Sequence, residues 1–235
     1  MGSFSIKGRH GVEQNPITSR ADAWLKRNAK GTITIQDSSH LRVEGFTISG
    51  FTSTAIKIFG SSNLLVTRNK IDFTGIGAAN GIYTSCDGGD MARKLWIHHN
   101  LFANIAPKTD KPGTANPFDG DSDREAVIFG EGGCQKLETE HLIGHNLSED
   151  CDGEDEMISF KTSKNMFRFN TVKNCMGSVH LRFGNGSVVH GNLFIGDPVT
   201  DDFFGGIRSD SPDIGAVESG AGTPLQPVAK EDVGP

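Results

Sequence analysis

Short apolar stretches alternate with polar positions along most of this chain and recur at a nearly constant spacing. Six of them share a glycine or asparagine at one place, at positions 45, 69, 100, 146, 170 and 192. The intervals are 24, 31, 46, 24 and 22 residues; we read the 46 as two turns of 23 and the 31 as one turn with an insertion. Such a period predicts a solenoid, in which each coil stacks on the one before.

A second series of short apolar strands precedes the first, at 55–59, 81–84, 126–129, 157–160, 178–181 and 205–208. Two or three short strands in each turn, without a helix, predict an all-β, right-handed parallel β-helix of roughly eight coils. Leucine-rich repeats share the period, but their consensus is absent. We expect the recurrent asparagines to stack at a turn and bond to one another through their side-chain amides.

One segment, 16–31, has the pattern of a helix instead. Thr18 or Ser19 can cap its start, Trp24 belongs to its apolar face, and Gly31 suits its end. We therefore expect a helix over 17–30 that caps the open end of the stack, where strand edges would otherwise be unpaired.

The length of 235 residues suits one elongated domain. We expect a flexible segment over 1–15, a single β-helix domain with its capping helix over 16–218, and a flexible tail over 219–235. Residues 103–125 are rich in proline, glycine and aspartate and predict a long loop that interrupts one coil.

Composition narrows the possible functions. A net charge of −6 argues against a general nucleic-acid binder. No apolar run approaches the length of a membrane span. The first residues lack the apolar core of a signal peptide, so the protein is either cytosolic or exported by a signal that this chain does not carry. The cysteines show no zinc spacing, and both free thiols and disulfides remain open; they are Cys86, Cys134, Cys151 and Cys175.

The most informative stretch is 151–182. Alternation in 157–161 places Ser159 and Lys161 outward, and alternation in 178–182 places His180 and Arg182 outward. Their inward neighbours are Ile158, Phe160, Val179 and Leu181. Since 182 − 161 is 21, one coil separates the lysine from the arginine. The two should therefore lie side by side, roughly 4.8 Å apart along the stack.

Two adjacent cations require a reason. A bound anion is one, and the other is that a permanent guanidinium favours a neutral amine, which can act as a base. Both suit β-elimination on a uronic-acid polymer. The acids at Glu154 and Glu156, with Asp121 and Asp123 nearby, are hard oxygen ligands that suit Ca²⁺.

These residues lie in motifs that occur in a fixed order, at 153–161, 167–177, 181–186, 191–197 and 205–208. With them the chain resembles the chondroitinase B and alginate lyase group, polysaccharide lyase family 6. The resemblance implies that Lys161 is the base, that Arg182 is the acid or positions it, and that Glu154 and Glu156 bind Ca²⁺.

The third calcium ligand of the family, an asparagine, falls near Ser122, so Asp121 or Asp123 would have to replace it, and we take Asp123 as the expected ligand. We expect His180 and Arg208 to contact substrate. Family members usually carry histidine after the arginine, where this chain has Phe183.

We therefore expect a calcium-assisted polysaccharide lyase, secreted or periplasmic, that cleaves alginate or a related uronate polymer. Its partner would be the anionic polysaccharide, with no nucleic acid, no membrane and a monomeric state. The alternative is a non-catalytic β-helix module that binds anionic glycan or has a structural role at the cell surface. A galacturonase-type hydrolase would need aspartates clustered on successive coils, and that register is absent from the sequence.

Overall fold

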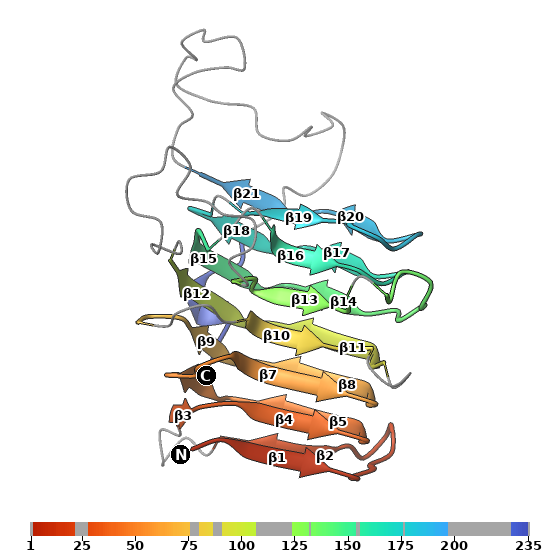
Figure 1. Cartoon of the computed structure of the whole chain (residues 1–235). Helices are drawn as coiled ribbons and strands as arrows, with labels where there is room; N and C mark the ends of the chain where they lie inside the picture. Colours follow the sequence, from red (N-terminus) through yellow and green to blue (C-terminus); the bar gives the residue numbers. More distant parts are fainter. Residues whose placement is uncertain are drawn as a thin grey trace, which may run out of the picture.

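The computed structural model describes residues 2–21, 28–75, 80–86, 91–106, 124–131, 133–153, 156–175, 177–196 and 227–234. Within these residues the chain winds through three parallel sheets of seven strands each, stacked coil on coil from β1 to β21 (Figure 1). Every strand pairs with the third strand before or after it, so three strands make one coil. The predicted parallel β-helix is confirmed, with seven coils in the described part against the roughly eight expected.

The strands of each sheet are as follows. Sheet 1 contains β1 (Phe4–Lys7), β4 (Ile33–Gln36), β7 (Thr54–Phe59), β10 (Asn80–Thr84), β13 (Val127–Phe129), β16 (Glu156–Phe160) and β19 (Ser178–His180). Sheet 2 contains β2 (Ile17–Arg20), β5 (Ser39–Glu44), β8 (Ser62–Thr67), β11 (Arg93–His98), β14 (Leu142–Gly144), β17 (Met166–Arg168) and β20 (Val188–His190). Sheet 3 contains β3 (Asn28–Lys30), β6 (Thr47–Ser49), β9 (Lys70–Asp72), β12 (Leu101–Ile105), β15 (Leu147–Cys151), β18 (Thr171–Lys173) and β21 (Leu193–Ile195).

The core is built from inward side chains that stack directly on one another. In sheet 1 one such column is buried throughout and consists of Ile33, Ile56, Ile82, Val127 and Ile158. β-Branched residues suit this position because their restricted side chains pack well on a pleated surface. Only the stack buries them, since a single coil has no interior of its own.

The expected asparagine ladder is present at the turn between sheets 2 and 3. The backbone N–H and the side-chain amide of Asn69 both donate to Oδ1 of Asn100, at 3.0 and 3.1 Å. The same pair of bonds links Asn100 to Asn146, Asn146 to Asn170, and Asn170 to Asn192. The ladder therefore satisfies buried backbone groups at a turn where no strand partner is available.

Two details of the predicted repeat are wrong. The equivalent of the asparagine in the second coil is Phe46, whose N–H donates to Oδ1 of Asn69, and Gly45 lies one place earlier. The 46-residue interval is one coil, because Asn100 bonds directly to Asn146. The extra residues of this coil fall between Ile105, where β12 ends, and Val127, where β13 begins, and they add no turn to the stack.

The predicted capping helix over 17–30 is wrong at both of its ends. Ile17–Arg20 is strand β2, paired with 41–44 of β5, and Asn28–Lys30 is strand β3. The next coil offers a row of backbone donors and acceptors that a strand satisfies and a helix cannot. The middle of the predicted helix, including Trp24, lies outside the described residues.

Both terminal segments hold structure in places where we expected flexible chain. Within 1–15, strand β1 pairs with β4. Within 219–235, a 3₁₀ turn at Lys230–Asp232 lies against sheet 3, and Val233 joins Leu101, Ala103 and Leu147 in a second small apolar cluster. Among the described residues, no helix is long and apolar enough to cross a membrane.

The ladder generates a stability prediction. Asn146→Ala should lower the free energy of unfolding by about 3 kcal/mol, because it leaves buried partners on both neighbouring coils unsatisfied. Asn192→Ala, at the end of the ladder and partly exposed, should cost about 1 kcal/mol. Urea unfolding of the two variants measures both values. Equal losses would show that the ladder does not act through buried, unsatisfied amides.

Candidate functional site

The outer face of sheet 1 carries the lysine and arginine singled out in the sequence. The N–H of Lys161 donates to Phe129 O, and the N–H of Arg182 donates to Phe160 O, both at 3.0 Å. Backbone pairing therefore places the two residues on consecutive coils at the same level of the sheet. Lys161 is half-buried and makes no ion pair or side-chain hydrogen bond with any residue that the structure describes.

Glu156, at the start of β16, connects the polar side chains of this face. Its carboxylate accepts a hydrogen bond from Ser159 Oγ at 2.6 Å and one from Arg182 Nη1 at 2.5 Å. Nδ1 of His180 lies 3.4 Å from the same carboxylate. The Glu156 side chain is only 8% exposed, whereas that of Arg182 is 46% exposed. The arginine is therefore held from the protein side and presents its other face to solvent.

The charge of Glu156 follows from these contacts. Burial alone would raise its pKa, but the hydrogen bond from Ser159 and the positive charges of Arg182, Lys161 and His180 together hold the pKa below its usual range. Glu156 is therefore a carboxylate at neutral pH, and it offsets part of the repulsion between the neighbouring cations.

Most of the expected calcium ligands lie outside the part of the chain that the structure describes. Glu154, Asp121 and Asp123 lie outside the described residues, and in the rest of the chain no group of three acids, histidines or cysteines is placed to hold a metal ion. Both oxygens of Glu156 are already engaged, one with Ser159 and the other with Arg182. Each oxygen keeps a further lone pair, so this carboxylate can still serve as one metal ligand. No chemical step is routed through calcium.

The other predicted residues are distributed as follows. His180 lies beside Glu156 on β19, and Arg208 lies outside the described residues. Val179 is partly buried against the core, as expected, but Leu181, expected to point inward, is 47% exposed. The reason is that β19 is the last strand of sheet 1 in the described part, so no further coil there covers its inner side. Phe183 packs its ring beneath the Arg182 guanidinium, 5.4 Å from ring centre to Cζ.

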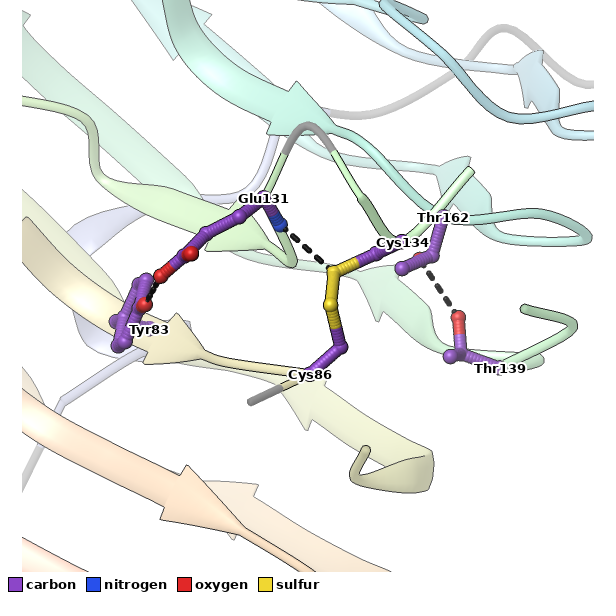
Figure 2. Close-up of a disulfide and its surroundings, with 6 residues drawn as sticks. All are labelled: Tyr83, Cys86, Glu131, Cys134, Thr139 and Thr162. Carbon is purple, nitrogen blue, oxygen red and sulfur yellow. Dashed lines mark hydrogen bonds between the residues drawn. A yellow bond between two sulfur atoms is a disulfide. The ribbon is translucent and has the colours of Figure 1, made fainter. Parts of the chain in front are cut away.

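Tyr83 and Glu131 belong to the same face and were not identified from the sequence. Tyr83 on β10 shares a row with Ser159 and His180, and its hydroxyl donates to the Glu131 carboxylate (Figure 2). Strand alternation could have placed Tyr83 outward. Glu131 gave no such signal, because it follows Gly130, whose φ of +83° ends the strand.

A disulfide holds the turn that carries Glu131. Cys86 is bonded to Cys134, and the N–H of Glu131 donates to Cys134 Sγ at 3.0 Å (Figure 2). A Cβ on Gly130 would come within 2.8 Å of Thr162, the residue after Lys161, so the turn packs closely under the lysine's coil. The other two cysteines, Cys151 and Cys175, are free.

The face as a whole can bind an anion and accept a proton. Lys161 supplies an amine without an ion-pair partner in the described chain, and Arg182 supplies a guanidinium of fixed position. An oriented cation next to a basic group is the arrangement that acid–base chemistry on a negatively charged ligand requires.

The sequence profile of a family described as Chondroitinase B matches residues 91–211, just over half of the chain. A comparison with curated proteins finds no match. The matched part contains the described residues named above at this site, except Tyr83 and Cys86.

Solved structures similar to this chain include polysaccharide lyases. One is a mannuronic acid specific polysaccharide family 6 lyase from human gut microbiota, at 18% identity and a TM-score of 0.60, covering 83% of this chain and 50% of that one. Another is the PL6 family alginate lyase AlyGC, at 20% identity and a TM-score of 0.55, covering 83% of this chain and 31% of that one. These likenesses bear on the fold, and the chain spans half or less of both proteins.

The contacts of Glu156 generate a pH-dependent prediction. Glu156→Gln should lower the free energy of unfolding by about 1 kcal/mol at pH 7, because the amide keeps the shape but loses the charge that pairs with Arg182. A carboxyl with a lowered folded-state pKa stabilises the fold above its ordinary pKa and loses that contribution as the pH falls through the lowered value. The difference between the two proteins should therefore shrink in acid.

Urea unfolding at pH 7 and at progressively lower pH measures this difference. Glu138→Gln is the matched control, since Glu138 forms an ion pair with Lys164 in which both side chains are more than half exposed, and it should change stability little. A Glu156→Gln difference that does not vary with pH would show that the charge plays no part.

Proposed function

The chain belongs to the chondroitinase B family, polysaccharide lyase family 6, and we propose that it cleaves a uronic-acid polymer, most readily alginate, by β-elimination. The observation that carries the proposal is Lys161, which has no ion-pair partner among the residues that the structure describes, next to an Arg182 that Glu156 holds in place. An amine base and a fixed cation on one open face are what this reaction needs.

The proposed reaction runs as follows. The Lys161 amine takes the proton from C5 of a uronate unit, and the electron pair left behind forms the C4–C5 double bond. The C4–O4 bond breaks, and O4 leaves with a proton for which Arg182 is the acid or positions the acid. The products are a shortened chain and an unsaturated sugar, and Lys161 must then release its proton to solvent.

The cations around the base have a second role in this proposal. Removing the C5 proton places negative charge next to the sugar carboxylate, and nearby positive groups stabilise that charge in the transition state. Arg182 supplies permanent positive charge, and His180 on β19 supplies an imidazole beside it. Arg208, predicted from the sequence to contact substrate, would add to it.

The substrate is argued from the relatives. The two similar structures described above are a mannuronic acid specific lyase and an alginate lyase. Their names favour alginate over chondroitin for this chain. Because the chain spans half or less of either protein, the substrate is part of the proposal.

The role of calcium in the proposal rests on acidic residues identified in the sequence. Glu154 and Asp123 would be its ligands together with Glu156, whose carboxylate oxygens each keep a lone pair for a metal ion. The ion would supply positive charge to the sugar carboxylate. The steps above are carried by Lys161 and Arg182.

The proposed location is the cell exterior or the periplasm, with the anionic polymer as partner of a monomeric protein. The Cys86–Cys134 disulfide supports this location, since disulfides persist in oxidising compartments and are rare in the cytosol.

Lys161→Ala should reduce the rate of product formation on alginate about 10³-fold, because a positioned general base contributes on the order of 10²–10⁴-fold. Absorbance of the unsaturated product follows the reaction, with alginate, dermatan and chondroitin tried in the presence of calcium. Lys164→Ala is the matched control, since Lys164 lies three residues further on, is exposed, and pairs with Glu138. It should leave the rate unchanged.

Three outcomes would count against the proposal. If none of the polymers yields product, the proposed lyase activity is wrong. Polymer binding without product would favour a non-catalytic glycan-binding module. Full activity of Lys161→Ala would remove the assigned base. Activity that persists in excess chelator would show that calcium has no role, and would leave the rest of the proposal intact.

A further inference from the structure

A row of apolar side chains runs along the outer face of sheet 2, away from Lys161 and Arg182. Strand register places its members directly next to one another on five consecutive coils: Leu65, Trp96, Leu142, Met166 and Val188. Trp96 is 55% exposed and Val188 is 45% exposed. Solvent-facing positions of a strand are normally polar, and contiguous apolar surface marks an interaction site. We call these five residues the apolar row.

At Trp96 the row forms the floor of a groove of about 400 Å³. One wall is the tight turn at 12–15, whose two ends exchange backbone hydrogen bonds, and which brings Glu13 and Pro16 to the groove. Leu65 and Trp96 form the apolar floor, and Lys94 stands at the rim. The groove therefore offers a flat aromatic surface with polar groups around it, which suits an amphipathic ligand.

Charge on the two sides of the apolar row is unequal. On one side Lys94 pairs with Glu140 and Lys164 with Glu138, and Glu13 adds a further acid at the groove. The other side carries Arg68, which is exposed, and the second outward row of sheet 2, which contains His98, Arg168 and His190.

Acidic residues also lie near this second side. Glu44 belongs to the same row but is engaged by Arg20 and Arg42, and Asp232 of the C-terminal segment lies near His99. Burial and neighbouring positive charges lower the pKa of His98 to about 4, so that at neutral pH its ring is uncharged. The arginines thus supply the permanent charge, and the imidazole supplies a hydrogen-bonding group.

We propose that the apolar row and its arginine side form a second, non-catalytic site that binds a segment of acidic polysaccharide. The apolar C–H face of a sugar ring packs on the Trp96 indole, carboxylates of the chain face Arg68 and Arg168, and hydroxyls meet the polar rim of the groove. The choice of an acidic sugar over a protein partner rests on Arg68 and Arg168 beside the row and on the polar residues that line the groove with Trp96.

The inference rests on the proposed function for the identity of the polymer, but not for its test. A site on sheet 2 would hold the long substrate chain to the protein while sheet 1 acts on another part of it. Linked sites of this kind raise the effective concentration of substrate at the catalytic face.

The test uses the full chain carrying Lys161→Ala, so that no turnover interferes. Retardation in gels containing alginate gives the apparent Kd, and titration with alginate oligosaccharides follows tryptophan fluorescence. The chain has two tryptophans, Trp24 and Trp96, so the difference between this protein and its Trp96→Phe form isolates the signal of Trp96.

Trp96→Ala should weaken binding to the alginate gel about tenfold or more, as loss of a central aromatic anchor does. Arg68→Gln should weaken it less, and the loss should diminish at high salt. Ile195→Ala is the control, since Ile195 is an exposed apolar side chain in the outward row of sheet 3, next to Lys173, and it should have no effect. Circular dichroism checks that each variant keeps the fold.

Several results would overturn the inference. Trp96→Ala could bind alginate as tightly as its parent, or a neutral glucan oligosaccharide of equal length could quench Trp96 as strongly. A dimer in size-exclusion chromatography that Trp96→Ala converts to a monomer would show that a second copy of the chain covers the row.

Results for the two sites are separable. If no unsaturated product forms but binding still depends on Trp96, the proposed function fails and the second site stands. In the otherwise unmodified protein, Trp96→Ala should raise KM for the polymer. It should leave kcat and KM for short oligosaccharides unchanged. A raised KM for the shortest substrates would instead place Trp96 in the catalytic groove and end the claim of a separate site.

Discussion

Hydrogen bonds between the side chains of stacked asparagines set the register of this molecule, and the other features follow from that register. Each asparagine from Asn69 to Asn192 satisfies backbone and side-chain groups of the neighbouring coil. A slip of one residue would exchange the inward and outward sides of every strand. The column of branched residues in the core and the rows on the outer faces therefore depend on the same strand register.

The same register also produces electrostatic repulsion within the candidate site. It places Lys161 next to Arg182, and two cations at that separation repel. Glu156 reduces this repulsion, because its nearly buried carboxylate is hydrogen-bonded to both Ser159 and Arg182. The arginine is thereby fixed, while the amine keeps no ion-pair partner in the described chain. This division gives the two cations different chemical roles on one face.

The two outer faces of the stack show how one repeat supports different surfaces. Both faces consist of strands in the same register, and outward positions are free to vary because only inward ones are packed. Sheet 1 uses them for charged and hydrogen-bonding groups, and sheet 2 uses them for the apolar row and a line of basic residues. Neither surface is visible in one coil, because each requires equivalent positions of several coils.

The fold class, the asparagine ladder and the adjacency of Lys161 and Arg182 could all be predicted from the sequence. These depend on local alternation and on a constant repeat length, which a chain displays along its length. Tertiary structure alone decided that 17–20 and 28–30 are strands, that the 46-residue interval is one coil, and that Cys86 pairs with Cys134. It also joined Glu156 to Arg182 and Tyr83 to Glu131. Such contacts join residues 26 or 48 positions apart, and their partners are chosen by how coils stack, which no local pattern records.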